Sequence, residues 1–366
     1  MDSRLLTNLN DEARNTRNPV VWARAVCRAA SHFARQGRTD DALTSIGVVR
    51  SQFKAELHHE VASWLMLAEG VLHYFRAETQ KSYDRIRRAY GLAIALKTDS
   101  ALPSCAAWMA HIEFNDSKYE QMAMHLEEAF TLALPSDHQA IARASLVLAM
   151  AYHLANEYQL ARPWYERARQ HASAEGDEAT ISAMLHDVAA YRASNVRLSD
   201  TFGEEYRREA DRAKMEAASS QNYDIAIGHS SLNFLTLMLN GLILTVSGKF
   251  TDALTTFSAI EVSEVPKRLL PTIQADRAWC LANCSRQKEA WELVLLASEN
   301  LVNVVDDDDV AYVFSRLSQT AEICSENYSA AVFRSNANRA LEKHHRFQAE
   351  LLARVNNIVK ERKNPA

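Results

Sequence analysis

A short phrase of apolar positions recurs along the chain: an aromatic residue, a small residue three positions later, and a second large residue four positions after that. Spacings of three and four place all of these side chains on one face of an α-helix. The clear copies are Tyr158-Ala161-Tyr165 and Phe250-Ala253-Phe257, and the looser ones are Tyr119-Met122-Leu126 and Tyr328-Ala331, which departs to Ser335. The pattern predicts amphipathic helices that recur at intervals.

A second pattern, with a small residue at its centre, lies upstream of these phrases. It reads Leu148-Ala149-x2-Tyr152, Asn240-Gly241-x2-Leu244 and Ala29-Ala30-x2-Phe33. Two antiparallel helices approach closely only where a small side chain faces the neighbour, so recurring Ala or Gly marks the contact. The two patterns together predict a series of helix pairs.

Composition points to the same class of fold. The chain has 366 residues, of which 48% are hydrophobic, but only nine are glycine and seven proline. A sheet protein of this length needs many tight turns, and tight turns need those two residues. Ala and Leu, which favour helices, are abundant. We therefore expect an all-α protein with a large buried core.

These residues resemble the tetratricopeptide repeat (TPR), with its L-G-x2-Y first helix and A-x3-F second helix. Leu146 to His171 is the best copy, and Pro163 fits because proline is tolerated in the first turn of a helix. The resemblance implies a right-handed α-solenoid of about eight TPR-like helix pairs with a C-terminal capping helix. Longer repeats of this kind are similar to the sensor modules of bacterial signalling regulators, where they accompany DNA-binding, kinase or cyclase output domains.

The small residue of the second helix sets the register of the repeats. Its expected positions are Ala42, Met122, Ala161, Ala253, Ala290 and Ala331. Two gaps are double length, so degenerate repeats are expected near Ala62–Leu96 and Ile181–Ala218, giving repeats of roughly 37 to 46 residues against about 34 for the usual TPR. The domains expected are a polar arm at 1–19, the repeat array at 20–335, and an amphipathic capping helix with a basic tail at 336–366.

The expected capping helix, about Asn336 to Lys363, has an apolar stripe and otherwise charged faces. The stripe consists of Phe347, Leu351, Val355 and Ile358. A terminal repeat needs a cap with one polar face, and this helix suits that role. The same stripe is also compatible with a homodimer or with a connection to a partner domain.

The cellular compartment and the class of partner can be inferred from several features of the chain. Met1 to Pro19 lacks the apolar core of a signal peptide, and the most apolar stretch, Leu232 to Val246, is too short for a membrane span. Five scattered cysteines suit a reducing compartment, so we expect a cytoplasmic protein. The net charge is −5 and the long middle of the chain is acidic, which makes nucleic acid an unlikely partner.

Each candidate motif for catalysis or metal binding lacks residues that its chemistry requires. We therefore expect that the protein is not an enzyme and binds no cofactor and no metal. His58-His59-Glu60 lacks the second histidine of a zincin motif, and His186-Asp187 lacks the further ligands of a metal phosphohydrolase. Cys280 and Cys284 share a helix face without other ligands nearby and are expected to be small core residues. Asp306–Asp309 lacks a calcium-loop pattern and is expected to stabilise the start of the following helix.

A basic cluster within one helical stretch allows two interpretations. It consists of Lys81, Arg85, Arg87 and Arg88, with Tyr83 and Tyr90 among them. Such a cluster could dock an acidic partner or a phosphate. The simpler interpretation is a solvated face paired with Asp84 and Glu78.

The family resemblance places a ligand groove on the concave side, which is lined by the first helix of each pair. The residues carried over to this groove are Arg35, His111, Asn115, Met150, His153, Trp279 and Asn283. The mixture of polar, apolar and aromatic groups suits peptide capture. The leading hypothesis is a scaffold or regulatory adaptor that binds a protein or peptide. The alternative is a receptor for a peptide or small ligand that controls a separate output partner.

Overall fold

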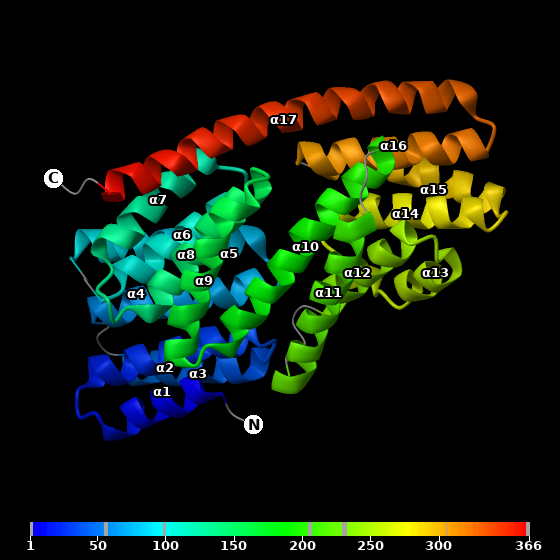
Figure 1. Ribbon diagram of the computed structural model, residues 1–366. Helices are drawn as coiled ribbons and strands as arrows, with labels where there is room; N and C mark the ends of the chain where they lie inside the picture. Colours follow the sequence, from blue (N-terminus) through cyan, green and yellow to red (C-terminus); the bar gives the residue numbers. More distant parts are fainter. Residues whose placement is uncertain are drawn as a thin grey trace. The chain divides into compact units, whose positions relative to one another are not determined.

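The computed structural model of the protein describes residues 3–54, 58–97, 100–203, 207–228, 233–304 and 306–363. Seventeen α-helices and three short 3-10 helices, without any strand, make up the regular structure of these residues (Figure 1). The all-α class expected from the scarcity of glycine and proline is confirmed.

In the described residues, the α-helices after the N-terminal one form eight consecutive pairs, which agrees with the expected number of about eight repeats. The helices are α1 Arg4–Asn15, α2 Pro19–Arg35, α3 Thr39–Gln52, α4 His59–Phe75, α5 Thr79–Ala95, α6 Leu102–Asn115, α7 Tyr119–Leu132, α8 His138–Leu154, α9 Tyr158–Glu175, α10 Glu178–Phe202, α11 Arg207–Ile227, α12 Asn233–Val246, α13 Phe250–Ser258, α14 Leu270–Asn283, α15 Gln287–Asn300, α16 Asp307–Ile323 and α17 Asn327–Lys363. The pairs run from α2–α3 to α16–α17, and the degenerate repeats are α4–α5 and α10–α11.

The chain divides into two compact units. Unit 1 comprises residues 1–184, 223–231 and 350–366, and unit 2 comprises residues 185–222 and 232–349. Helices α10, α11 and α17 therefore each have residues in both units.

Each well-formed pair is built around two small or slender residues that are twelve positions apart. The first-helix member is Ala30, Gly70, Ala110, Ala149, Gly241, Ala278 or Ser318, and the second-helix member is Ala42, Ser82, Met122, Ala161, Ala253, Ala290 or Ala330. All second-helix members are buried. A Cβ atom at Gly241 would lie 2.4 Å from Cε1 of Phe257, so the helices meet too closely there for any larger residue.

The expected register is wrong in the last pair, and it did not include the small residue of the second pair. Ala331 is exposed, whereas Ala330 is 3% exposed and its carbonyl accepts a hydrogen bond from Ser318 Oγ. In the second pair the position is held by Ser82, whose hydroxyl donates to the Gly70 carbonyl at 2.9 Å. Serine can occupy this position because its hydroxyl is satisfied by the neighbouring helix. A pattern based on alanine does not include it.

The turn inside each pair is also repeated. Seven turns place one residue in the left-handed conformation two positions before the second helix: Gly37, Ala77, Ser117, Asn156, Gly248, Ser285 and Ser325. In the third pair the Ser117 amide donates to the Phe114 carbonyl, and the Lys118 amide donates to the Glu113 carbonyl. This is a Schellman motif, which pairs the last carbonyls of the first helix. One backbone design thus links most of the pairs.

The ends of the array differ from the expected domain boundaries. Residues 4–15 of the expected polar arm form α1, whose Leu5, Leu6 and Leu9 are buried against α2. The boundary expected at 336 lies inside α17, which begins at Asn327 because its first turns are the second helix of the last pair.

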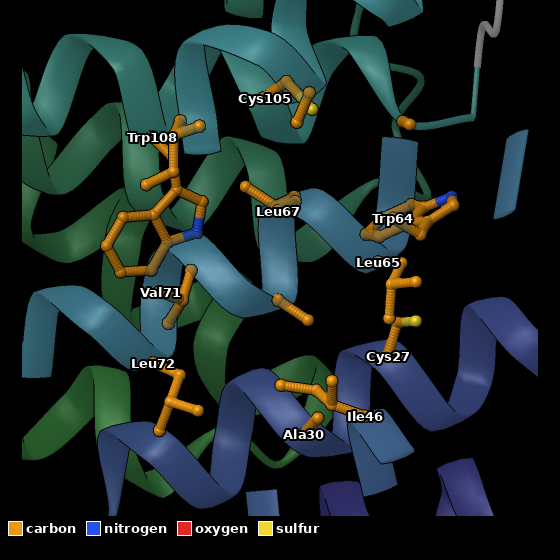
Figure 2. Close-up of a cluster of buried hydrophobic side chains, with 14 of the residues drawn as sticks. Cys27, Ala30, Ile46, Trp64, Leu65, Leu67, Val71, Leu72, Cys105 and Trp108 are labelled. Carbon is orange, nitrogen blue, oxygen red and sulfur yellow. The ribbon is translucent and has the colours of Figure 1, made fainter. Parts of the chain in front are cut away.

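The core of unit 1 is a continuous apolar cluster on α2 to α6. Figure 2 shows Leu67, Val71 and Leu72 of α4 between side chains of α2, such as Ala30, and Trp108 of α6. In α6 every residue from Pro103 to Phe114 is buried. In α8 the same holds from Ala140 to His153, so these first helices are surrounded by protein on all sides. In the described part of the chain, no helix is long and apolar enough to cross a membrane.

The corrected register can be tested with neighbouring alanines of α17. Ala330→Leu should lower the free energy of unfolding by about 1–3 kcal/mol, because the added atoms overpack a closed helix contact. Ala331→Leu should change it by less than about 0.5 kcal/mol, because this side chain faces solvent. Urea unfolding of both variants measures the difference. Equal destabilisation by the two substitutions would contradict the register.

Candidate functional site

Two of the residues carried over by family resemblance, His111 and Asn115, lie together at the C-terminal end of α6. Asn115 Nδ2 donates to Tyr74 Oη at 2.8 Å, and His111 Nε2 lies 3.1 Å from the same oxygen. Tyr74 comes from the C-terminal end of α4. The first helices of consecutive repeats therefore supply one hydrogen-bonded group.

The Asn115 amide determines which nitrogen of His111 carries the proton. Asn115 Nδ2 also lies 3.4 Å from His111 Nε2, and an amide NH2 group can only donate. Tyr74 Oη accepts a hydrogen bond from Asn115 and lies within hydrogen-bond distance of His111 Nε2. Nε2 is therefore the acceptor, and a neutral His111 carries its proton on Nδ1.

Trp108 and Arg143 complete this group. The Trp108 ring packs edge-on against both His111 and Tyr74, and the Arg143 guanidinium of α8 lies 4.3 Å from the centre of the Trp108 ring. Burial, followed by the charge of Arg143, holds the pKa of His111 well below its usual value, so the imidazole is neutral at pH 7. We call Tyr74, Trp108, His111, Asn115 and Arg143 the Tyr74–His111 cluster.

Sequence reasoning missed Tyr74, Trp108 and Arg143. Tyr74 was out of reach because the repeat α4–α5 had no assigned register, although it stands 41 positions before Asn115, close to one repeat. Trp108 and Arg143 lie on first helices with an almost unbroken run of buried residues, where hydrophobic periodicity cannot distinguish one face from another.

Arg35 is buried rather than exposed in a groove, so that expectation is wrong. Arg35 Nη1 lies 2.6 Å from Asp177 Oδ2 and 2.7 Å from Thr180 Oγ1, and His32 Nδ1 lies 3.4 Å from Asp177 Oδ1. Although burial alone would raise it, Arg35 and His32 hold the pKa of Asp177 well below its usual value. This network joins α2 to the start of α10 inside unit 1.

Met150 and His153 of α8 are also buried, which contradicts their expected exposure. His153 Nδ1 lies 3.2 Å from Oη of Tyr165, in the second helix of the same pair. Because this bond is made within one repeat, it explains the burial of His153 as packing between α8 and α9.

In unit 2, Trp279 and Asn283 have different surroundings. The Arg316 guanidinium lies 5.0 Å from the centre of the Trp279 ring, so this tryptophan flanks a buried charge. Asn283 is exposed, and its Nδ2 donates to the Trp279 carbonyl four residues earlier. The contacts of these two residues therefore lie within unit 2.

Arg316 is the centre of a buried ionic network in unit 2. Its Nη2 lies 2.6 Å from Asp200 Oδ2 and its Nε lies 3.8 Å from Asp276 Oδ1, while Tyr312 donates to Asp276. Burial raises the pKa of Asp276 to about 6, although the charge of Arg316 lowers it. The network connects α10, α14 and α16.

The acidic run Asp306–Asp309 begins α16, as expected, and supplies three carboxylates to its first turn. Asp309 is paired with the Arg197 guanidinium. Burial, followed by the charge of Asp309, raises the pKa of Asp308 to about 7, with Arg197 acting in the opposite direction. The residues of this helix start are half-buried.

The remaining candidate residues named from the sequence make contacts that have a structural explanation. The His58 side chain accepts from the Glu60 amide at the start of α4, and all five cysteines are free thiols. Lys81 pairs with Glu78, and Arg85 with Glu69, consistent with a solvated basic face. Among the residues whose placement is described, no group of three or more metal ligands is found.

The apolar stripe of α17, for which a homodimer was the alternative to capping, is covered by the protein's own helices in this structure. Leu351, Val355 and Ile358 are buried, and Tyr152 Oη donates to Asn356 Oδ1 at 3.0 Å. Arg354 pairs with Glu120 of α7 at 2.7 Å. The end of α17 thus covers helices of unit 1, which agrees with a capping role.

Comparisons with known proteins add little to these observations. The chain matches no family model and no curated protein. One similar solved structure is described as a circular tandem repeat protein with novel repeat topology and enhanced subunit contact surfaces. It shares 14% sequence identity over 98% of this chain and 98% of its own, with a TM-score of 0.23. Because that score is low, the assignment as a helical repeat protein rests on the helix pairs described above.

The raised pKa of Asp308 predicts a pH-dependent stability. A buried carboxyl with a raised pKa stabilises the folded state while protonated, and this contribution is lost as the pH rises through about 7. Asp308→Asn keeps the neutral shape at every pH. Between pH 6 and pH 8 the variant should therefore gain about 1 kcal/mol in unfolding free energy relative to the original protein. Urea unfolding at both pH values measures this; the same offset at each would refute the assignment.

Proposed function

We propose that the protein is a TPR-like scaffold of the cytoplasm that binds a protein or peptide partner. The proposal is supported by the repeated helix pairs, because repeat arrays offer several first helices to one ligand. Five free thiols agree with a reducing compartment. The receptor alternative is not carried further, because no observation favours it, and no reaction is proposed.

The observation that carries the proposal is the Tyr74–His111 cluster. It joins aromatic rings, an amide and a guanidinium from three consecutive first helices, the types of group that dominate binding energy at interfaces. Tyr74 and Asn115 are only half-buried, so they form its accessible edge. Arg35, Met150 and His153 leave the proposed binding set because they are buried and lie outside this cluster with its half-buried edge.

Binding can be tested by affinity capture from the native cell, followed by titration calorimetry with the captured partner. Asn115→Ala removes the donor to Tyr74 and should weaken binding about tenfold, the effect of losing one buried hydrogen bond of about 1.4 kcal/mol. Arg169→Ala, an exposed change on α9, is the matched control and should bind normally. A thermal melt of each variant monitors folding.

Two results would count against this function. One is a partner that binds Asn115→Ala and the original protein equally well, since the cluster would then have no part in recognition. The other is the absence of any stoichiometric partner in the capture. The exposed Asn283 provides a second comparison, because Asn283→Ala tests the groove residue of unit 2 independently.

A further inference from the structure

The side chain of Arg167 on α9 pairs with no carboxylate in the described part of the chain. Its guanidinium lies 5.3 Å from the centre of the Phe130 ring on α7 and 5.7 Å from the centre of the Trp164 ring, one turn earlier on α9. These rings hold the guanidinium in place but offer no oxygen to its N–H donors. Burial lowers the pKa of Arg167, and the charge of no neighbouring acid opposes this shift.

Partly buried arginines elsewhere in the protein do have such a partner. Arg28 pairs with Glu175 in unit 1, and Arg197 pairs with Asp309 in unit 2. A guanidinium that is partly removed from water loses hydration, and an anion that accepts its N–H groups restores the lost interactions. The half-buried Arg167 therefore indicates an anionic group that the described residues do not supply.

Two histidines lie beside Arg167. His171 follows one turn later on α9, so both side chains project from the same face of the helix. Its Nδ1 lies 2.9 Å from Nδ1 of His138, in the first turn of α8. Burial, followed by the charges of His138 and Arg167, lowers the pKa of His171. We call Phe130, His138, Trp164, Arg167 and His171 the Arg167–His171 site.

The histidine pair presents at least one N–H group to solvent. One Nδ1 atom donates and the other accepts, because a hydrogen bond needs one of each. When both rings are neutral, the accepting ring therefore carries its proton on Nε2. Both residues are half-buried, and neither Nε2 is a buried atom without a partner, nor does it bond to another described residue. This N–H is therefore accessible to a ligand.

The acidic residues nearest in the sequence have other partners. Asp137 accepts a backbone amide in the turn before α8. On α9, Glu166 pairs with Arg162, and Glu175 pairs with Arg28. The positive charge of the Arg167–His171 site is therefore not neutralised by these carboxylates.

We propose that the Arg167–His171 site binds a phosphate group, whose oxygens accept hydrogen bonds from the guanidinium and from imidazole Nε2. A phosphate monoester has three acceptor oxygens and a charge of about −1.5 to −2, so it can accept from both groups at once. A carboxylate has two oxygens and a single charge. A metal cation at the histidine pair is disfavoured by the charge of Arg167.

This inference goes beyond the scaffold function, and the site shares no residue with the Tyr74–His111 cluster. The phosphate can belong to a phosphorylated side chain of a partner or to a small free phosphate. Both sources make the same contacts with the guanidinium and the imidazoles, but a phosphopeptide adds backbone and neighbouring side chains. The test therefore uses both kinds of probe and needs no captured partner.

The experiment follows the imidazole nitrogens of the full chain, labelled with 15N-histidine, by NMR at constant ionic strength. The probes are inorganic phosphate and the capped phosphopeptide acetyl-Ala-pSer-Ala-amide. Their controls are acetate and the peptide without phosphate. The His138→Gln and His171→Gln variants assign the two signals. The expected result is saturable movement of both signals by a phosphate probe with a Kd below about 1 mM, and no such movement by the controls.

Two variants of α9 locate the site. Arg167→Gln should weaken phosphate binding at least tenfold, because it removes the guanidinium. Arg162→Gln removes the same charge from an exposed arginine of the same helix that is paired with Glu166, so it should bind phosphate normally. A thermal melt of each variant monitors folding. If Arg167→Gln does not fold, the comparison of phosphate with acetate on the original protein decides.

The outcomes distinguish the sources and can overturn the inference. Tighter binding of the phosphopeptide than of inorganic phosphate supports a phosphorylated partner, and the reverse supports a small free phosphate. The inference is overturned if neither probe moves the two histidine signals, or if acetate moves them equally. Equal phosphate binding by a folded Arg167→Gln variant and the original protein would also overturn it.

Discussion

Close approach of two helices at a pair of small residues is the constraint on which the rest of the structure depends. Twelve residues separate Gly70 from Ser82 and Gly241 from Ala253, and in each pair the helices meet where one or both side chains are short. The same spacing fixes where the first helix ends and where the second begins. Large residues one turn away, such as Ile86 and Phe257, then have defined places in the core. The register of each repeat is therefore determined by contacts inside that repeat and does not depend on its packing against the next one.

Because this constraint is local, it could be predicted from the sequence. Small residues and heptad-like spacing gave the number of pairs and most of their register. The exposure of the residues assigned to the groove could not be predicted in the same way. Arg35 is buried by Asp177, which lies 142 positions later, and no periodicity within one helix reports such a contact. The burial of Leu5 and Leu9 could not be predicted either, because three leucines in a charged segment resemble a polar arm until their packing partner is known.

Buried ion pairs occur in both units, and their contribution is geometric more than energetic. Arg35 with Asp177 in unit 1, and Arg316 with Asp200 in unit 2, each connect helices that are distant in sequence. Removing such charges from water costs about as much as their attraction returns, so they add little net stability. A misplaced partner, in contrast, would leave a buried charge unpaired at a cost of about 3–5 kcal/mol. These pairs therefore select one arrangement of helices within each unit.

The repeated turns are positions at which thermal stability can change without a change in recognition. Ala77, Ser117, Ser285 and Ser325 hold a left-handed backbone that glycine adopts freely, whereas a side chain costs about 1 kcal/mol there. These residues lie in the loops between helices, away from the small-residue contacts. Exchange of such residues for glycine or asparagine would adjust the melting temperature in small steps while the contacts between the paired helices stay unchanged. An organism adapting to a new growth temperature would have several independent positions at which to make that adjustment.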